Sequence, residues 1–325
     1  MPAIPLHVGV SESDRTRPLL DRQVTIAGAD ATIELMPVQA LFNRQLTTHV
    51  FDCCEFPLTS YIRTLESPEK PYLAVPIFPS RHFRLSCVFV NADSGIAKPA
   101  DLADKRVGVP VFDMAAAVWL RGMFEDYYGL DRTAPVYVSG GLEAARSGDE
   151  HPQHYPAKFR VEHVADRSLA EMLAAGAIDA LYTARAPSTW PSPNVRRLFN
   201  DPIAADLDYF RRTGIFPPMH VVALKRPLAL RHPDLARNVF EAFAAAQRIA
   251  QRALADSVAL AVMLPWLLEH LHFTEQQLGS DYWSTGFAKN KTMLETIIRY
   301  MRDDGLTTTL FAPEDLFADP GLLAT

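Results

Sequence analysis

Short apolar segments typical of β-strands alternate with segments of helical periodicity along most of the chain. The first predicted strands are 6–10 (LHVGV), 31–38 (ATIELMPV) and 49–56 (HVFDCCEF), and two more follow at 72–78 and 83–90. Helical segments lie among these strands at 17–22, 38–46 and 58–65. Because parallel strands need a crossover between them, usually a helix, this alternation predicts an α/β fold with parallel sheets.

A second series of strands and helices begins near Lys98. A strand is predicted at 106–109, and the strongly helical segment 114–128 ends at Gly129, a residue typical of helix C-termini. The loop 186–194 contains three prolines and predicts a crossover back to the first series.

The last third of the chain is rich in helical segments, predicted at 233–254, 258–270 and 292–303. Their apolar faces need a partner, and the first series of strands offers one. We therefore expect two lobes with a ligand cleft between them. Lobe 1 would be discontinuous, comprising residues 1–95 and 196–325, and lobe 2 would comprise residues 96–195.

Composition and charge limit the class of partner. The chain has 325 residues, of which 48% are hydrophobic and 22% charged, the balance of a soluble globular protein long enough for two domains. Its formal net charge of −6 disfavours nucleic acid or an anionic membrane as a partner. The longest apolar stretch, 257–268, contains Pro265 and is too short to cross a bilayer.

The N-terminal segment MPAIPLHVGVSESD lacks the basic start and apolar core of a secretory signal. Only three cysteines occur, an odd and sparse count that suits a reducing compartment better than a disulfide framework. We therefore expect a cytoplasmic protein.

Several segments carry a resemblance to known families. DLADKRVGVP (101–110) resembles the start of the second lobe in type 2 periplasmic-binding-protein folds. The 4,5-dihydroxyphthalate decarboxylase family is similar over nearly the whole chain, and the matching segments are IFPSRHFRLSCVFVN (77–91), GVPVFDMAAAVWLRGMFEDYYG (108–129), IDALYTARAP (178–187) and YFRRTGIFPPMHVVALKR (209–226).

The resemblance implies a two-lobed, type 2 periplasmic-binding-protein-like fold and a carboxy-lyase activity. The implied reaction is loss of carbon dioxide from a hydroxylated phthalate- or benzoate-like acid, without an organic cofactor. The family pattern leads us to expect a serine-rich phrase where Cys53 and Cys54 stand and a glutamine-like residue at Asp113, so the ring substitution of the substrate is left open.

Decarboxylation of such an acid needs a proton donor near the ring carbon that loses the carboxylate. His220 is our first choice, because histidine changes charge near neutral pH and the preceding Pro217-Pro218-Met219 turn could direct it at the substrate. Glu55 follows the predicted strand HVFDC and is the second choice, since a carboxyl group in an apolar site can stay protonated. For Glu55, capping of the next helix is an equal alternative. For His220, the alternative is a structural role.

Carboxylates of the substrate need cationic anchors, and arginine binds them with two parallel hydrogen bonds. Arg81 and Arg84 lie in the PSRHFR turn, Arg185 follows the predicted strand IDALYT, and Arg212 precedes a Thr-Gly turn. Phe83 could stack on an aromatic ring. For each arginine the alternative is a surface charge or a structural ion pair.

The start of the predicted helix at 114–128 could hold an anion with its free backbone N–H groups. Asp113 would cap this helix or face the substrate, and Met114, Ala115 and Ala116 would supply N–H groups. No His, Cys, Asp and Glu spacing of a recognised metal site occurs, and no Walker loop, dinucleotide fingerprint or GxSxG turn is present.

Two alternatives to a decarboxylase remain at this stage. One is a non-catalytic binding protein for a small aromatic or carboxylic acid. The other is a two-lobed enzyme of precursor biosynthesis of the thiamine-pyrimidine type, which lacks its expected histidine and cysteine motifs here. The helix-rich last third could also support a homo-oligomer.

Overall fold

The computed structural model describes residues 2–147, 155–317, 320–322 and 324–325. Contacts between Cα atoms divide the chain into two compact units, which are described separately. Unit 1 comprises residues 1–81, 218–295 and 311–325, and unit 2 comprises residues 82–217 and 296–310.

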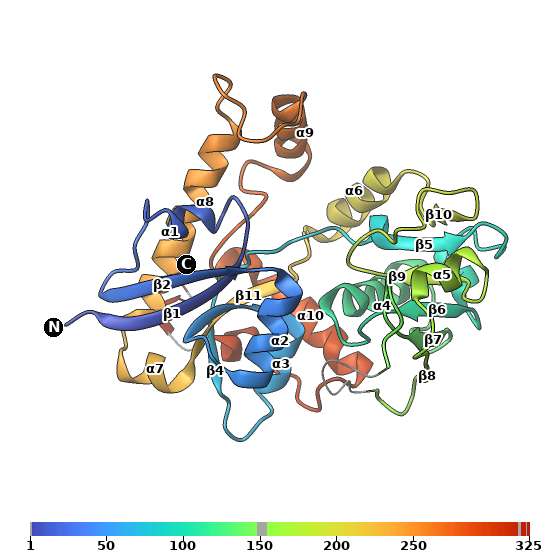
Figure 1. Ribbon diagram of the computed structural model, residues 1–325, viewed down its shortest axis with the longest axis horizontal. Helices are drawn as coiled ribbons and strands as arrows, with labels where there is room; N and C mark the ends of the chain where they lie inside the picture. Colours follow the sequence, from blue (N-terminus) through green and yellow to red (C-terminus); the bar gives the residue numbers. More distant parts are fainter. Residues whose placement is uncertain (1, 148–154, 318–319, 323) are drawn as a thin grey trace. The chain divides into compact units, whose positions relative to one another are not determined.

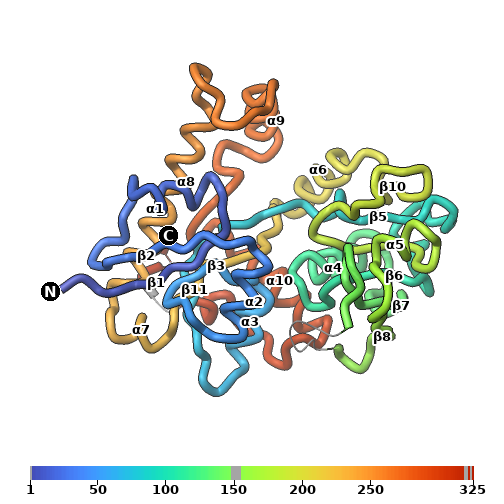
Figure 2. Tube along the Cα trace, viewed as in Figure 1, coloured from blue at the N-terminus to red at the C-terminus, as the bar shows by residue number. Residues whose placement is uncertain are grey.

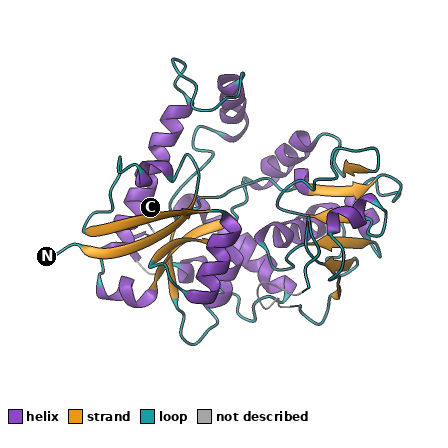
Figure 3. Ribbon diagram, viewed as in Figure 1, coloured by secondary structure: helices purple, strands orange, loops and turns teal. Residues whose placement is uncertain are grey.

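Unit 1 is built on a five-stranded mixed sheet (Figures 1 and 3). Its strands, in sheet order, are β2 (Ala29–Met36), β1 (Ile4–Ser11), β3 (Cys53–Pro57), β11 (His220–Lys225) and β4 (Tyr72–Val75). β1 runs parallel to both β2 and β3, whereas β11 runs antiparallel to β3 and β4. The late strand β11 therefore inserts between two early strands, which makes unit 1 discontinuous in sequence.

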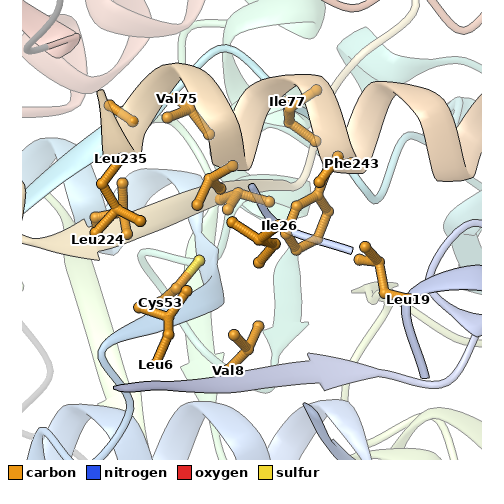
Figure 4. Packing of buried hydrophobic residues seen from close by; sticks show 14 of the residues in the cluster. Leu6, Val8, Leu19, Ile26, Cys53, Val75, Ile77, Leu224, Leu235 and Phe243 are labelled. Carbon is orange, nitrogen blue, oxygen red and sulfur yellow. The ribbon is translucent and has the colours of Figure 1, made fainter. Parts of the chain in front are cut away.

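Helices cover both faces of this sheet. The helices of unit 1 are α1 (Arg17–Leu20), α2 (Val38–Thr48), α3 (Leu58–Thr64), α7 (Arg226–Arg231), α8 (Leu235–Leu254) and α9 (Leu267–Leu278), with 3₁₀ turns η3 (Ala288–Asn290), η4 (Pro313–Leu316) and η5 (Pro320–Leu322). Val239 and Phe243 of α8 pack with Val8 and Leu224 in a buried apolar cluster, part of which is shown in Figure 4. A Cβ atom added to Gly9 would lie 2.8 Å from a Leu41 methyl group, so α2 packs closely on the opposite face.

Unit 2 contains a six-stranded sheet. Its strands, in sheet order, are β10 (Val195–Arg197), β5 (Val88–Asn91), β9 (Ala180–Tyr182), β6 (Arg106–Val109), β7 (Val136–Ser139) and β8 (Arg160–His163). β5 pairs antiparallel with β9 and β10, and the remaining neighbours are parallel. The accompanying helices and turns are η1 (Leu85–Cys87), η2 (Pro99–Leu102), α4 (Ala115–Tyr128), α5 (Leu169–Ala174) and α6 (Pro202–Thr213).

The helix α10 (Lys291–Asp304) returns the chain to unit 2. Its Asp304 carboxylate accepts hydrogen bonds from Arg121 of α4 at 2.9 and 2.7 Å and from Arg132 at 2.9 Å. Arg121 and Asp304 are fully buried, so loss of the Asp304 charge would leave the Arg121 guanidinium inside the unit without its carboxylate partner.

The unit boundaries differ from the lobes expected from the sequence. Residues 82–95 and 196–217 belong to unit 2, because β10 pairs with β5 and β5 pairs with β9, rather than with strands of the first sheet. Residues 296–310 also belong to unit 2. The strand expected at 83–90 is shorter, since η1 occupies 85–87 before β5 begins.

Among the described residues, no helix is long and apolar enough to cross a membrane.

Candidate active site

The two residues predicted to be catalytic lie together on the sheet of unit 1. The β3–β11 register pairs Val222 with Glu55 and His220 with Pro57. Because side chains alternate between faces along a strand, Glu55 and His220 lie on the same face as diagonal neighbours. Glu55 was expected to follow its strand, but it lies within β3 and does not cap the next helix, whose N-cap is Pro57.

Every oxygen of the Glu55 carboxyl group has a hydrogen-bond partner. The Oε1 atom lies 2.6 Å from Nδ1 of His220. The Oε2 atom accepts from the backbone N–H of Ser11 at 2.9 Å and from its hydroxyl group at 2.5 Å. The carboxyl group is 1% exposed, whereas the His220 side chain is 14% exposed. Ser11, Glu55 and His220 therefore form a hydrogen-bonded network. Its carboxyl group is buried, and its imidazole is partly accessible.

The surroundings of the Glu55 carboxyl group determine whether it is ionised. Burial raises the pKa of Glu55, but the hydrogen bond and charge of His220 and the two bonds from Ser11 outweigh it and hold that pKa below its usual value. Glu55 is therefore ionised at neutral pH and accepts from Nδ1–H of His220. The Nε2 atom is then the nitrogen that can accept or deliver a proton at the opposite side of the ring.

Phe42 limits the orientation of the His220 ring. The two rings meet edge to face, with centroids 4.7 Å apart and an interplanar angle of 88°. Together with the bond to Glu55, this contact holds the imidazole from two sides.

Ser11 is a site residue that sequence reasoning missed. The parallel register of β1 and β3 pairs Gly9 with Cys54, and this brings the end of β1 beside Glu55. Thr16 donates a hydrogen bond of 2.7 Å to the Ser11 carbonyl and fixes the loop that follows. The available signal was a polar residue at the carboxyl end of a strand, where open α/β sheets bind ligands.

Arg15, on the loop after β1, is a second residue that was missed. Its guanidinium lies 4.5 Å from the centroid of the Trp283 ring, and its Nε donates to the Pro79 carbonyl at 2.9 Å. It also pairs with Asp14 at 2.6 Å, yet a quarter of its side chain stays exposed. These contacts orient a cation on the loop that begins at Ser11.

Arg81, a predicted anchor, is buried in unit 1. Its Nη2 donates to the Ser284 carbonyl at 2.9 Å and to the Asn290 side-chain oxygen at 2.5 Å, and its guanidinium lies 5.1 Å from the Phe78 ring centroid. These bonds connect the end of the first segment of unit 1 to the segment before α10.

The other residues of the predicted turn belong to unit 2. Phe83 stacks on Phe216 with ring centroids 4.6 Å apart. Arg84 is buried, donates to the Ala184 carbonyl at 3.2 Å and lies 3.8 Å from the Cys87 sulfur. Burial raises the pKa of the Cys87 thiol, but a hydrogen bond with His82 and the Arg84 charge outweigh it and lower that pKa to about 7.

The predicted anion site at the start of α4 lies in unit 2. The helix begins at Ala115 with Met114 as its N-cap, and the Met114 N–H bonds to the Val111 carbonyl at 3.3 Å. Asp113 lies in the preceding turn, directly before the N-cap residue, while Ala115 and Ala116 are buried.

Arg185 and Arg212 are exposed side chains of unit 2. Arg185 lies on the loop after β9, and its backbone N–H donates to the Thr183 hydroxyl group at 3.3 Å. Arg212 pairs with Asp208 one turn earlier on α6 at 2.7 Å. Neither residue is part of a buried network.

Within the described part of the chain, no group of three or more His, Cys, Asp or Glu residues could hold a metal ion. Cys53, Cys54 and Cys87 are free and buried.

Comparison of the sequence with curated proteins shows which family the chain belongs to. Over 320 residues the chain is 35% identical to a 4,5-dihydroxyphthalate decarboxylase of Comamonas testosteroni, with 98% of this chain and 97% of that protein covered. The chain belongs to the 4,5-dihydroxyphthalate decarboxylase family. A second family member, from Pseudomonas putida, is 37% identical over 209 residues, covering 63% of this chain and 81% of the relative. No family model matches the chain.

Solved structures show the fold of this decarboxylase family member. The periplasmic aliphatic sulphonate-binding protein SsuA of Escherichia coli superposes with a TM-score of 0.53 at 13% identity, covering 97% of this chain and 92% of that one. The alkanesulfonate-binding protein SsuA of Xanthomonas axonopodis gives 0.52 at 13% identity, covering 98% and 99%. The predicted family, carboxy-lyase class and periplasmic-binding-protein-like fold are thus confirmed.

Proposed function

We propose that this protein decarboxylates a hydroxylated aromatic acid and that His220 delivers the proton to the ring carbon. The observation that carries the proposal is the 2.6 Å hydrogen bond between His220 and the buried carboxylate of Glu55. The proposal is also supported by membership of a family whose named members are 4,5-dihydroxyphthalate decarboxylases. We propose that the reaction needs no organic cofactor and no metal.

The reaction balances with one proton and no redox change. A ring hydroxyl ortho or para to the departing carboxylate, in its phenolate form, supplies electrons while protonated His220 transfers the Nε2 proton to the ring carbon. The intermediate is a dienone that still carries the carboxylate on that carbon. The carbon–carboxylate bond then breaks, carbon dioxide leaves, and the bonding electrons restore the aromatic phenolate. Solvent returns a proton to His220.

Glu55 and Ser11 act in this proposal through His220. An ionised carboxylate beside Nδ1–H stabilises the protonated imidazole, and burial strengthens that attraction because the surroundings screen it poorly. The two bonds from Ser11 keep the carboxylate ionised and in place. We therefore propose that His220 transfers the proton and that Glu55 has a positioning role.

The substrate carboxylates need anchors. We propose Arg15 for unit 1, because it is oriented, partly exposed and carried by the loop that directly follows Ser11. For unit 2, Arg185 stays the preferred candidate, with Arg84, Arg212, Phe83 and the start of α4 as further predicted contacts. Arg81 is a weaker candidate, since its Nη2 is already bonded to Ser284 and Asn290.

The direct test is turnover in heavy water. Purified protein is incubated with 4,5-dihydroxyphthalate and with related hydroxybenzoates, and carbon dioxide and the product are measured. We expect stoichiometric carbon dioxide and one deuterium at the ring position that lost the carboxylate. Tight binding of these acids without any release of carbon dioxide would support the alternative, a binding protein, and would contradict the proposal.

A further inference from the structure

The segment between α8 and the end of α9 exposes an unusual number of large apolar side chains. We call residues 255–278 the arm; it belongs to unit 1, and Figures 1 and 2 show it at the far end of α8, away from the unit 1 sheet. Its exposed apolar residues are Val258, Leu260, Val262, Met263, Leu264, Trp266 and Phe273. The other exposed large apolar residues of the described chain occur singly, at Val38, Ile203, Leu230 and Leu310.

The exposure within the arm is nearly complete at several positions. Val258 is 93% exposed, Met263 is 103% exposed and Trp266 is 67% exposed. The helix expected at 258–270 begins only at Leu267, because Pro265 disfavours helical backbone at the residue before it. The apolar run before Leu267 therefore forms no helix that could bury one face against α8. A soluble monomer rarely presents such a concentration of apolar surface without a partner.

Charges of opposite sign flank this apolar surface. Arg248 and Arg252 are exposed near the end of α8, and Glu269 is exposed on α9. None of these three side chains forms an ion pair with any other residue that the structure describes. In a two-fold interface every contact between two different residues occurs twice, so Arg252 of each copy can pair with Glu269 of the other.

We propose that the arm is the surface through which two copies of this chain associate about a two-fold axis. A standard interface takes roughly 800 Å² from each partner, and the arm offers seven exposed large apolar side chains for its centre. Interfaces between identical subunits have apolar cores with a polar rim, and the arm combines an apolar centre with flanking charges. A second copy satisfies both features.

The test is the mass of the full-length protein in solution by light scattering after size exclusion. The wild-type protein is expected at twice 36.2 kDa or at a higher even multiple. The Trp266→Glu variant and the Met263→Glu variant are each expected to have a lower mass in solution than the wild type. That mass is 36.2 kDa if the arm is the sole contact between copies. Leu230→Glu is the matched control, because Leu230 on α7 is 65% exposed but lies outside the arm, and it should keep the wild-type mass.

Charge reversal adds a test that does not touch the apolar residues. Arg252→Glu and Glu269→Arg should each weaken association, and the double variant should restore it. A wild-type protein that is monomeric, or Trp266→Glu and Met263→Glu variants that both keep the wild-type mass while folded, would overturn the proposal. These measurements need no turnover, so their outcome is independent of the proposed decarboxylation.

Discussion

The Nδ1 atom of His220 lies 2.6 Å from the Oε1 atom of Glu55, although the two residues are 165 positions apart in the chain. The antiparallel pairing of β3 and β11 produces this relationship, because it places both side chains on one face of the sheet. The imidazole therefore has one nitrogen bonded to a buried carboxylate and one left for chemistry.

Replacing Glu55 by Gln removes the charge but keeps the shape of the side chain. We expect kcat to fall by roughly 100-fold, because the imidazolium loses its counter-charge and the imidazole loses its fixed tautomer. The high-pH limb of the kcat profile should also move to more acidic values, because the reaction needs the protonated imidazole and the variant holds that proton less well. Steady-state rates from pH 5 to pH 9 measure both effects. A change in KM alone, with an unmoved pH profile, would contradict the positioning role.

Replacing Ser11 by Ala removes one of the two hydrogen bonds that Oε2 of Glu55 accepts. A hydrogen bond to a buried charge is worth about 2 kcal/mol, so the free energy of unfolding should fall by about that amount. Activity should fall less than in Glu55→Gln, because the backbone N–H of Ser11 still holds the carboxylate. Ser13→Ala is the control on the same loop, since Ser13 bonds Thr16 rather than Glu55. Equal losses in both variants would rule out a specific contribution from Ser11.

The lowered pKa of Glu55 makes stability depend on pH in a defined direction. Its folded pKa lies below the value of about 4.3 that a glutamate has in an unfolded chain. The stabilisation is therefore fully present above that unfolded value, and it is lost as the pH falls through the folded pKa. Urea unfolding at pH 7, 5, 4 and 3 should show a steeper acid loss in the wild type than in Glu55→Gln. Parallel curves would mean that the Glu55 pKa is not lowered.

The three cysteines should differ in reactivity. Burial raises the pKa of Cys53 and of Cys54, whereas His82 and Arg84 lower the pKa of Cys87 to about 7. Iodoacetamide should therefore modify Cys87 first in the folded protein, at a rate that rises as the pH passes 7. Peptide mass spectrometry identifies the site, and Cys87→Ser should abolish the early phase. Equal labelling of Cys53 under native conditions would be inconsistent with this ranking.

Much of the fold could be predicted from alternating strand and helix patterns, but the pairing of distant segments could not. Periodicity indicates that 88–91 is a strand, yet only its partners β9 and β10 assign it to unit 2. Glu55 and His220 could be chosen singly because carboxylates and histidines carry proton transfer. Their hydrogen bond depends on the β3–β11 register, which no local pattern specifies.

The predicted binding residues illustrate the same limit. Arg81 was chosen for its turn, but residues more than 200 positions later, Ser284 and Asn290, bind its guanidinium. Ser11 and Arg15 were missed because serine and arginine are common at and after strand ends. Only their contacts with residues distant in sequence, Glu55 and Trp283, mark them as candidates for the site. Long-range contacts, rather than local propensity, decide which polar side chains form the site.

The most direct test of the account is kcat for carbon dioxide release from 4,5-dihydroxyphthalate by His220→Gln, measured beside His7→Gln. His7 is a matched control on the same sheet, because its Nε2 pairs with the Glu34 carboxylate at 2.9 Å. The account predicts that His220→Gln loses at least about 100-fold in kcat while staying folded, and that His7→Gln stays close to the wild type. A folded His220→Gln variant with a near wild-type kcat would contradict it.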